Sequence, residues 1–254
     1  AALRAAYDGA GIRKRDDATV DDATAAVFDA LADQQNALLE ELRTLSAYIS
    51  AFVSTNSRND VAQARQSELS QHAVELQKLG TRFQAWVGSI DLEALIGRSA
   101  VARAHAFPLR KAAQAARHQM SEPEEDLAAS LSPSGGTAWA RLHGNVASQL
   151  VVPVAGRPVP LPMSAVRSLA HDKDPDVRKA AYDAELKGWE RVAVPLAAAL
   201  NSIKGEVRTL NHRRCWQDDL EPMLFANNID RATLDAMHAA CQESFPDFRR
   251  YLRA

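Results

Sequence analysis

The stretch HRRCWQDDLEPML, residues 212–224, concentrates side chains that could take part in chemistry. His212 and Cys215 have a spacing that could hold a metal ion, and Cys241 could supply a third ligand. The neighbouring arginines and Trp216 fit packing and surface charge at least as well. We therefore expect no metal site here, and a three-ligand site remains the alternative.

Other residue patterns that could form a metal-binding or catalytic site are incomplete. None of the seven histidines is followed by glutamate, so the His-Glu-x-x-His pattern of zinc peptidases is absent. His72 lies near a helical seam, where we expect a partly buried, hydrogen-bonded side chain. The oxygen-rich 171–176, HDKDPD, lacks the glycine and glutamate of a calcium loop and is interpreted as a helix cap. Glu124, Glu125 and Asp126 are adjacent, so they fan around a helix instead of facing one another.

Glycine-rich phosphate loops and the nucleophile elbow Gly-x-Ser-x-Gly are also missing. The sequence therefore predicts no catalytic and no metal-binding residues, and leaves the substrate-binding residues unknown. The long apolar seams that remain are the pattern of a helical framework.

Composition narrows the class of protein further. The 254 residues are 46% hydrophobic and 24% charged, with a net charge of −2. A dedicated nucleic-acid binder would carry a basic excess, and no apolar run approaches the roughly 20 residues of a membrane span. The charged first residues do not resemble a signal peptide, and two cysteines are too few for a disulfide framework. We expect a cytoplasmic protein without nucleic-acid or membrane partners.

A long helix is predicted from Asp21 or Asp22, as N-cap, to about Ser54. Apolar residues recur along this helix at alternating spacings of three and four residues and form a seam on one face. Only Gln35 interrupts the seam with a polar side chain. The seam positions are Phe28, Leu31, Gln35, Leu38, Leu42, Leu45, Ile49 and Phe52. A second seam follows at Leu69, Leu76, Phe83 and Ile90. The two helices should form a long antiparallel hairpin, which makes 1–90 the N-terminal domain.

The remainder, 91–254, is predicted as a helical array with one small β-hairpin near 148–162. Shorter helices should fill 91–131, with Ser121 and Glu124 as a capping box. Asp174 and Pro175 should begin one long helix that Pro195 kinks near its middle.

A final helix is expected after Asn228, with Asp230 as its cap, and its pattern has no stop signal before Ala254. With no methionine at its start, the chain is expected to be part of a longer polypeptide. The predicted fold class is mainly α.

The second half resembles a known family. D-x-D-x-x-V-R-x-x-A-Y at 172–182, a late L-N on the following helix, and F-P-x-F-x-R-Y-L at 245–252 occur in the order found in the oligoendopeptidase F family of thimet-like zinc oligopeptidases. The similarity begins near Leu38 and rests on an ordered series of loose motifs. Upstream, ISAFVSTNSRND, IDLEALI and HQMSEPEEDLAASLSPSGGTAWARLH also follow the family order.

The resemblance implies a mostly helical body around a deep channel for short peptides, with this portion as one wall. In the family, zinc is held by a His-Glu-x-x-His helix and a further glutamate that lie C-terminal to the F-P-x-F segment. No family catalytic residue therefore maps onto this sequence. We expect zinc only in the intact protein, none bound to this portion, and no activity from it alone. The expected partners are the C-terminal catalytic half and short peptides.

Two alternatives remain. The chain could be a non-enzymatic interaction protein that docks through the hairpin of residues 22–90. It could also be a HEAT-type solenoid, since LAHDKDPDVRKAAYDAEL resembles one repeat unit. No second copy of that unit is found.

Overall fold

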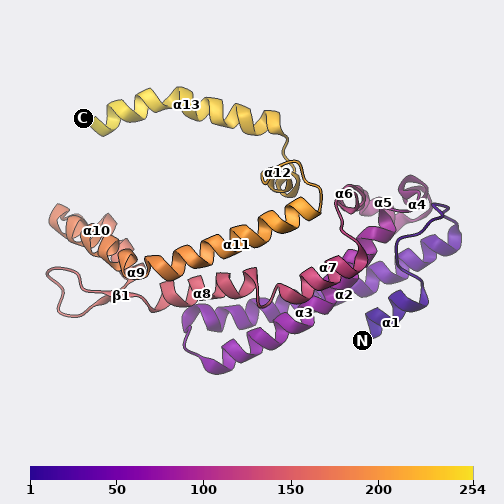
Figure 1. Cartoon of the computed structure of the whole chain (residues 1–254), viewed down its shortest axis with the longest axis horizontal. Coiled ribbons are helices and arrows are strands. Elements are labelled where there is room, and N and C mark those ends of the chain that lie inside the picture. The colour runs from indigo at the N-terminus through magenta and orange to yellow at the C-terminus, as the bar shows by residue number, and fades with distance from the viewer. Residues whose placement is uncertain (254) are drawn as a thin grey trace. The chain divides into compact units, whose positions relative to one another are not determined.

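The computed structural model describes residues 1–253, and the chain is mainly α-helical, as predicted (Figure 1). Two compact units are distinguished, one ending at Glu206 and one beginning at Val207. The helices of the first unit begin with α1 (Ala2–Gly9), α2 (Asp22–Thr55), α3 (Asp60–Val87), α4 (Leu92–Arg98), α5 (Ala100–Ala104), α6 (Ala106–Ala116), α7 (Glu122–Leu131) and α8 (Gly136–Gln149).

The chain continues with β1 (Val151–Val152), β2 (Leu161–Pro162), α9 (Met163–Ser168), the 3-10 turn η1 (Leu169–His171), α10 (Pro175–Glu190), α11 (Ala193–Arg213), α12 (Glu221–Asn227) and α13 (Arg231–Arg253). Within residues 1–253, no helix combines the length and the apolar character that a membrane crossing requires.

The predicted hairpin is formed by α2 and α3, and its caps explain where the helices begin. The side chain of Asp21 accepts a hydrogen bond of 2.7 Å from the backbone N–H of Thr24, and Asn59 accepts one of 3.0 Å from Ala62. Each bond satisfies an N–H group that the first helical turn leaves without a partner. The start at Asp21 was predicted from sequence, whereas the cap at Asn59 was not.

The seam of α2 is buried over only part of its length. Leu31 is buried, whereas Leu38, Leu45 and Phe52 are 37%, 51% and 45% exposed. Burial of α2 is concentrated near its N-terminus, where α1 and the short helices α4 to α6 add further surfaces. His72 was expected to be partly buried and is exposed instead.

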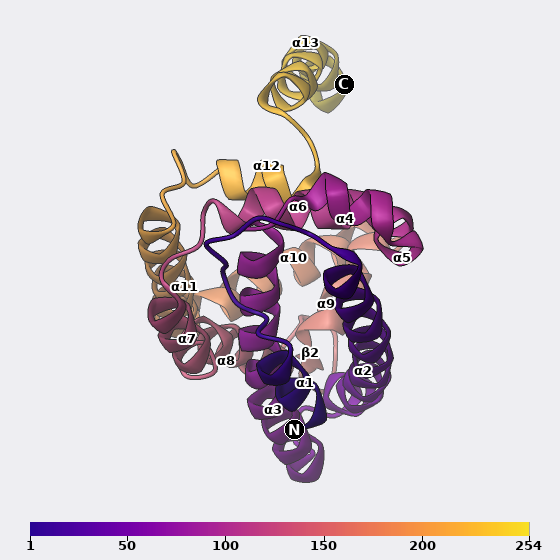
Figure 2. The same ribbon diagram turned by 90° about the vertical axis from the view of Figure 1, so that its right-hand side faces the viewer.

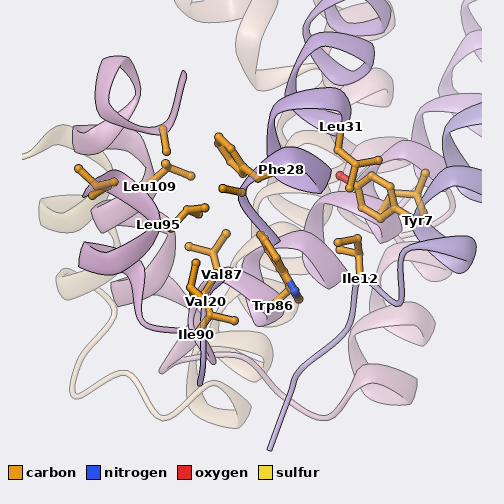
Figure 3. Close-up of a cluster of buried hydrophobic side chains, with 14 of the residues drawn as sticks. Tyr7, Ile12, Val20, Phe28, Leu31, Trp86, Val87, Ile90, Leu95 and Leu109 are labelled. Carbon is orange, nitrogen blue, oxygen red and sulfur yellow. The ribbon is translucent and has the colours of Figure 1, made fainter. Parts of the chain in front are cut away.

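A main core lies at this end of the hairpin (Figure 3). Its buried residues are Leu3, Tyr7, Ile12, Val20, Ala25, Phe28, Leu31, Leu79, Trp86, Val87, Ile90, Leu95, Ile96, Ala102 and Leu109. The contribution of residues 1–20 was not predicted, because α1 is short and buries only Leu3 and Tyr7. Figure 2 shows this N-terminal segment before it enters α2; it is attached by the backbone N–H of Arg15, which donates to Ser89 Oγ at 2.9 Å.

Short helices fill 91–131, as predicted. The backbone N–H and hydroxyl of Ser121 both donate to Glu124, at 3.1 and 2.7 Å, in the predicted capping box. Ser99 is buried at the start of α5, where its hydroxyl donates to Asp29 of α2 and accepts from the N–H of Ala102. This serine therefore connects the helix start to the hairpin.

The predicted β-hairpin is present and short. β1 and β2 pair antiparallel, with Val152 opposite Leu161, and Gly156 has φ +77° in the connecting segment. Val152 and Met163 pack against α10 at Gly188, where a Cβ would lie only 2.6 Å from Val152 Cγ1. Glycine at this position allows the close contact that forms the second core.

The helix beginning at Pro175 was expected to continue through Pro195 with a kink, and this prediction is wrong. It ends at Glu190, and α11 begins at Ala193. Proline lacks an N–H, and its ring collides with the carbonyl four residues earlier, here that of Arg191. The break at Arg191 and Val192 places Pro195 in the first turn of the new helix, where that missing N–H has no intrahelical partner to lose.

Candidate functional site

The histidine–cysteine stretch forms the end of a helix. Cys215 adopts φ +56°, in the left-handed region. Its N–H donates to the carbonyl of His212, and the N–H of Trp216 donates to that of Asn211, both at 3.1 Å. This pair of hydrogen bonds is the Schellman motif, which satisfies carbonyls at a helix C-terminus. The position of Cys215 thus has a structural explanation.

An acid of the same stretch, Asp218, organises the turn just before the next helix, α12. Asp218 accepts hydrogen bonds from the N–H groups of Leu220 and Glu221, at 2.9 and 2.7 Å, and another from the guanidinium of Arg231. The bond from Glu221 contributes most to lowering the pKa of the Asp218 carboxyl, and Arg231 adds to it. Asp230 in turn accepts from the N–H of Thr233 at the start of α13, as predicted.

The possible metal ligands do not converge. Across residues 1–253, no group of three or more histidine, cysteine or acidic side chains could hold a metal ion. Cys215 and Cys241 are free, exposed thiols. The alternative site of His212, Cys215 and Cys241 therefore has no support, and this chain's described residues do not fit a zinc ion.

The remaining acidic candidates have structural roles. Asp174 caps α10 and accepts from the N–H of Asp176 at 2.9 Å, which confirms the interpretation of HDKDPD as a cap. Glu124 belongs to the capping box, and the buried Glu125 accepts a hydrogen bond of 3.1 Å from the N–H of Met120. Neither arrangement is an acid–base pair.

One pocket in the first unit is lined by an excess of cationic side chains, and we refer to it as the basic pocket. Its volume is about 630 Å³. The lining residues come from the segment after α1, the C-terminal ends of α3 and α6, and the start of α7: Arg13, Lys14, Thr81, Arg82, Ala85, Gly88, Ser89, Ala116, Arg117, Gln119, Met120, Ser121 and Glu122. Four of these side chains are cationic and one is a carboxylate.

Arg82 is the most enclosed cation of the basic pocket, with 12% of its side chain exposed. Its Nε donates to the carbonyl of Ile12 at 3.1 Å, and its Nη1 donates to Asp8 at 2.9 Å. The guanidinium also lies 5.9 Å from the ring centroid of Tyr7. Its Nη2 is buried and has no hydrogen-bond partner within residues 1–253.

The basic pocket is not predictable from the sequence pattern. The run Arg13-Lys14-Arg15 is visible in the sequence, but its nearness to Arg82 and Arg117 depends on how α3 and α6 meet. A Cβ on Gly88 would lie 2.3 Å from Ala116 Cβ, so the two helix ends approach closely. No motif or spacing encodes that contact.

Comparison with solved structures shows which class of protein shares this fold. A crystal structure of oligoendopeptidase-F from Enterococcus faecium matches 98% of this chain with a TM-score of 0.80, at 15% identity and over 49% of its own length. A crystal structure of a candidate peptidase from Chlamydophila abortus matches 99% of this chain with a TM-score of 0.58, at 17% identity and over 44% of its own length. The chain thus has the fold of the N-terminal part of an oligopeptidase F-like peptidase and spans about half the length of these structures.

Comparison of the sequence with family profiles gives a result consistent with the structural comparison. The family profile described as Oligopeptidase F matches residues 89–151, from the end of the hairpin to β1. None of the curated proteins compared with this chain is significantly similar to it. The profile match and the structural match both make this chain similar to the N-terminal portion of oligopeptidase F proteins.

Proposed function

We propose that this chain is the N-terminal half of a zinc-dependent oligopeptidase of the cytoplasm that hydrolyses short peptides. In this proposal the half forms one wall of the substrate channel and contributes no catalytic group. Its partners are the C-terminal catalytic half of the same protein and the peptide substrate. Such a wall would admit short extended peptides and exclude folded proteins.

One observation carries the proposal: the likeness to oligoendopeptidase-F extends over 98% of this chain but only 49% of the larger structure. The local chemistry is compatible with a framework role, because the histidine–cysteine stretch and its acids are occupied as helix ends and caps. Zinc, when bound in the other half, would activate the attacking water. The contribution of this chain would be to position the peptide and limit access.

The experiment compares the full gene product with residues 1–254 alone on a quenched fluorescent peptide. We expect the full protein to cleave the peptide, to lose activity with a zinc chelator and to recover when zinc is restored. Residues 1–254 should show no turnover with or without zinc. Chelator-resistant cleavage by the full protein, or defined turnover by the 254-residue chain, would contradict the proposal.

An interaction protein that docks through 22–90 is a second candidate, and exposed apolar side chains favour it. Tyr48 and Phe52 are 65% and 45% exposed and contact each other edge to face, with ring centroids 5.1 Å apart. Exposed apolar patches often mark binding surfaces. A full gene product that lacks peptidase activity would favour this candidate; zinc-dependent turnover would favour the peptidase.

A further inference from the structure

We propose that the basic pocket binds a small phosphate-bearing molecule. The charge of its lining is the first argument. Arg13, Lys14, Arg82 and Arg117 face a pocket whose lining contains one carboxylate, that of Glu122. A concave site with such an excess of one sign attracts and concentrates ions of the opposite sign.

The second argument is that these cations are poorly neutralised. The side chains of Lys14 and Arg117 form no ion pair with any carboxylate in the part of the chain that the structure describes. Arg13 lies 3.9 Å from Asp8, a carboxylate that already accepts a hydrogen bond from Arg82. A bound anion would supply the missing counter-charge.

Arg82 provides a fixed donor. The carbonyl of Ile12 and the carboxylate of Asp8 hold two sides of its guanidinium, so its orientation is set before any ligand arrives. The third nitrogen, Nη2, is buried without a partner in residues 1–253. Leaving a buried donor without an acceptor is unfavourable, so a bound water, ion or ligand is expected beside this nitrogen.

The size and walls of the pocket indicate the class of ligand. A volume of about 630 Å³ lies within the range of small-molecule sites and is far larger than a simple anion requires. Ala85, Ala116 and Met120 add apolar wall to the charged groups. Arginine can donate two paired N–H groups to phosphate oxygens. Four cations complement a ligand that carries several phosphate charges better than a ligand that carries one carboxylate.

The ligand can be a nucleotide or an inorganic polyphosphate, and calorimetry on this chain distinguishes the two. ATP, tripolyphosphate and citrate are titrated separately, without divalent metal and at constant ionic strength. We expect one site for the phosphate compounds. Tighter binding of ATP would show that the organic body contacts the apolar wall, and equal affinity would identify the phosphate chain as the recognised group.

The variant Lys14→Gln/Arg117→Gln removes two exposed cations that lack ion pairs, so folding should be preserved. Its affinity should fall at least about tenfold, because two charge-assisted contacts are lost. The matched control is Arg43→Gln/Arg58→Gln, which removes the same charge from exposed positions outside the pocket. Control affinity should remain within about twofold of the parent chain.

Three results would overturn the proposal: no binding of either phosphate compound, equal weakening in both variant pairs, or citrate binding as tightly as the phosphates. The first would leave the pocket without a ligand of this class, and the second would show nonspecific charge attraction. The third would show a carboxylate site. None of these results depends on peptidase activity, so the two proposals can fail separately.

Discussion

The hydroxyl of Tyr7 donates a hydrogen bond of 3.0 Å to Oε1 of Gln35. Gln35 is the polar interruption of the α2 seam, and Tyr7 comes from a helix that precedes the hairpin by more than ten residues. The Tyr7 side chain is fully buried. The glutamine therefore gives the buried phenol an acceptor that an apolar seam residue could not supply.

Replacing one member of this pair should destabilise the first unit. For Tyr7→Phe or Gln35→Leu we expect a loss of about 1–2 kcal/mol in the free energy of unfolding, because the remaining polar group is left without its partner. Urea denaturation followed by circular dichroism measures the loss. The double variant Tyr7→Phe/Gln35→Leu should recover most of it, since both polar groups are removed together. A double variant as unstable as the sum of its parts would show that the two side chains are not coupled.

Stability should also fall at high pH. Burial raises the pKa of Tyr7 from 10.0 to about 12, although the nearby Arg82 acts in the opposite direction. Between these values the unfolded chain loses the phenolic proton while the folded chain keeps it. The stabilising contribution is therefore complete below pH 10 and is lost as pH rises towards 12, with a slope of up to about 1.4 kcal/mol per pH unit. Urea denaturation across this range should show a smaller decline for Tyr7→Phe; parallel curves would contradict the assignment.

Gly188 should not tolerate a methyl group. In Gly188→Ala the new Cβ would lie 2.6 Å from Val152 Cγ1 and 2.8 Å from Met163 Cε. Overpacking of this kind costs about 1–3 kcal/mol, more than the helix propensity that alanine adds. The matched control is Gly80→Ala, whose Cβ meets no atom within 4 Å and which should be neutral or stabilising. Thermal unfolding of both variants tests this, and equal melting temperatures would refute the close contact.

The role of Cys215 as a helix end can be tested by comparing two cysteines. Cys215→Gly should keep or raise stability, because glycine adopts the left-handed conformation without strain. Cys215→Val should cost about 1–2 kcal/mol, since a branched side chain is poorly accommodated at φ +56°. The same substitution at the helical, exposed Cys241 should change stability by less than about 0.5 kcal/mol. If Cys215→Gly were the damaging change, a role for the thiol itself would have to be sought.

Four helix starts could be predicted from sequence because local chemistry decides them. Asp21, Ser121, Asp174 and Asp230 each stand where a polar side chain meets the first free N–H groups of a helix. Pro195 was recognised as a disruption, but whether proline bends or ends a helix depends on the packing of both segments. Here one helix ends at Glu190 and the next begins at Ala193.

The core around α1 and the basic pocket could not be predicted, for a common reason. Tyr7 with Gln35, and Arg82 with Arg13, are brought together by contacts between segments far apart in the chain. Periodicity reports which face of a helix is apolar and says nothing about which other helix covers it. In the histidine–cysteine stretch, by contrast, the residue types suggested a chemical site, whereas in the structure they form the end of a helix.

The uneven burial of α2 means that one continuous helix contains two segments of different local stability. Near Phe28 and Leu31, an amide proton can exchange with solvent only when the surrounding core opens. Beyond Gln35, where Leu45 and Phe52 are half exposed, little apolar contact would be lost if a few turns unwound on their own. We therefore expect amide exchange to be faster in the far part of α2 than at its base, which Tyr7 anchors.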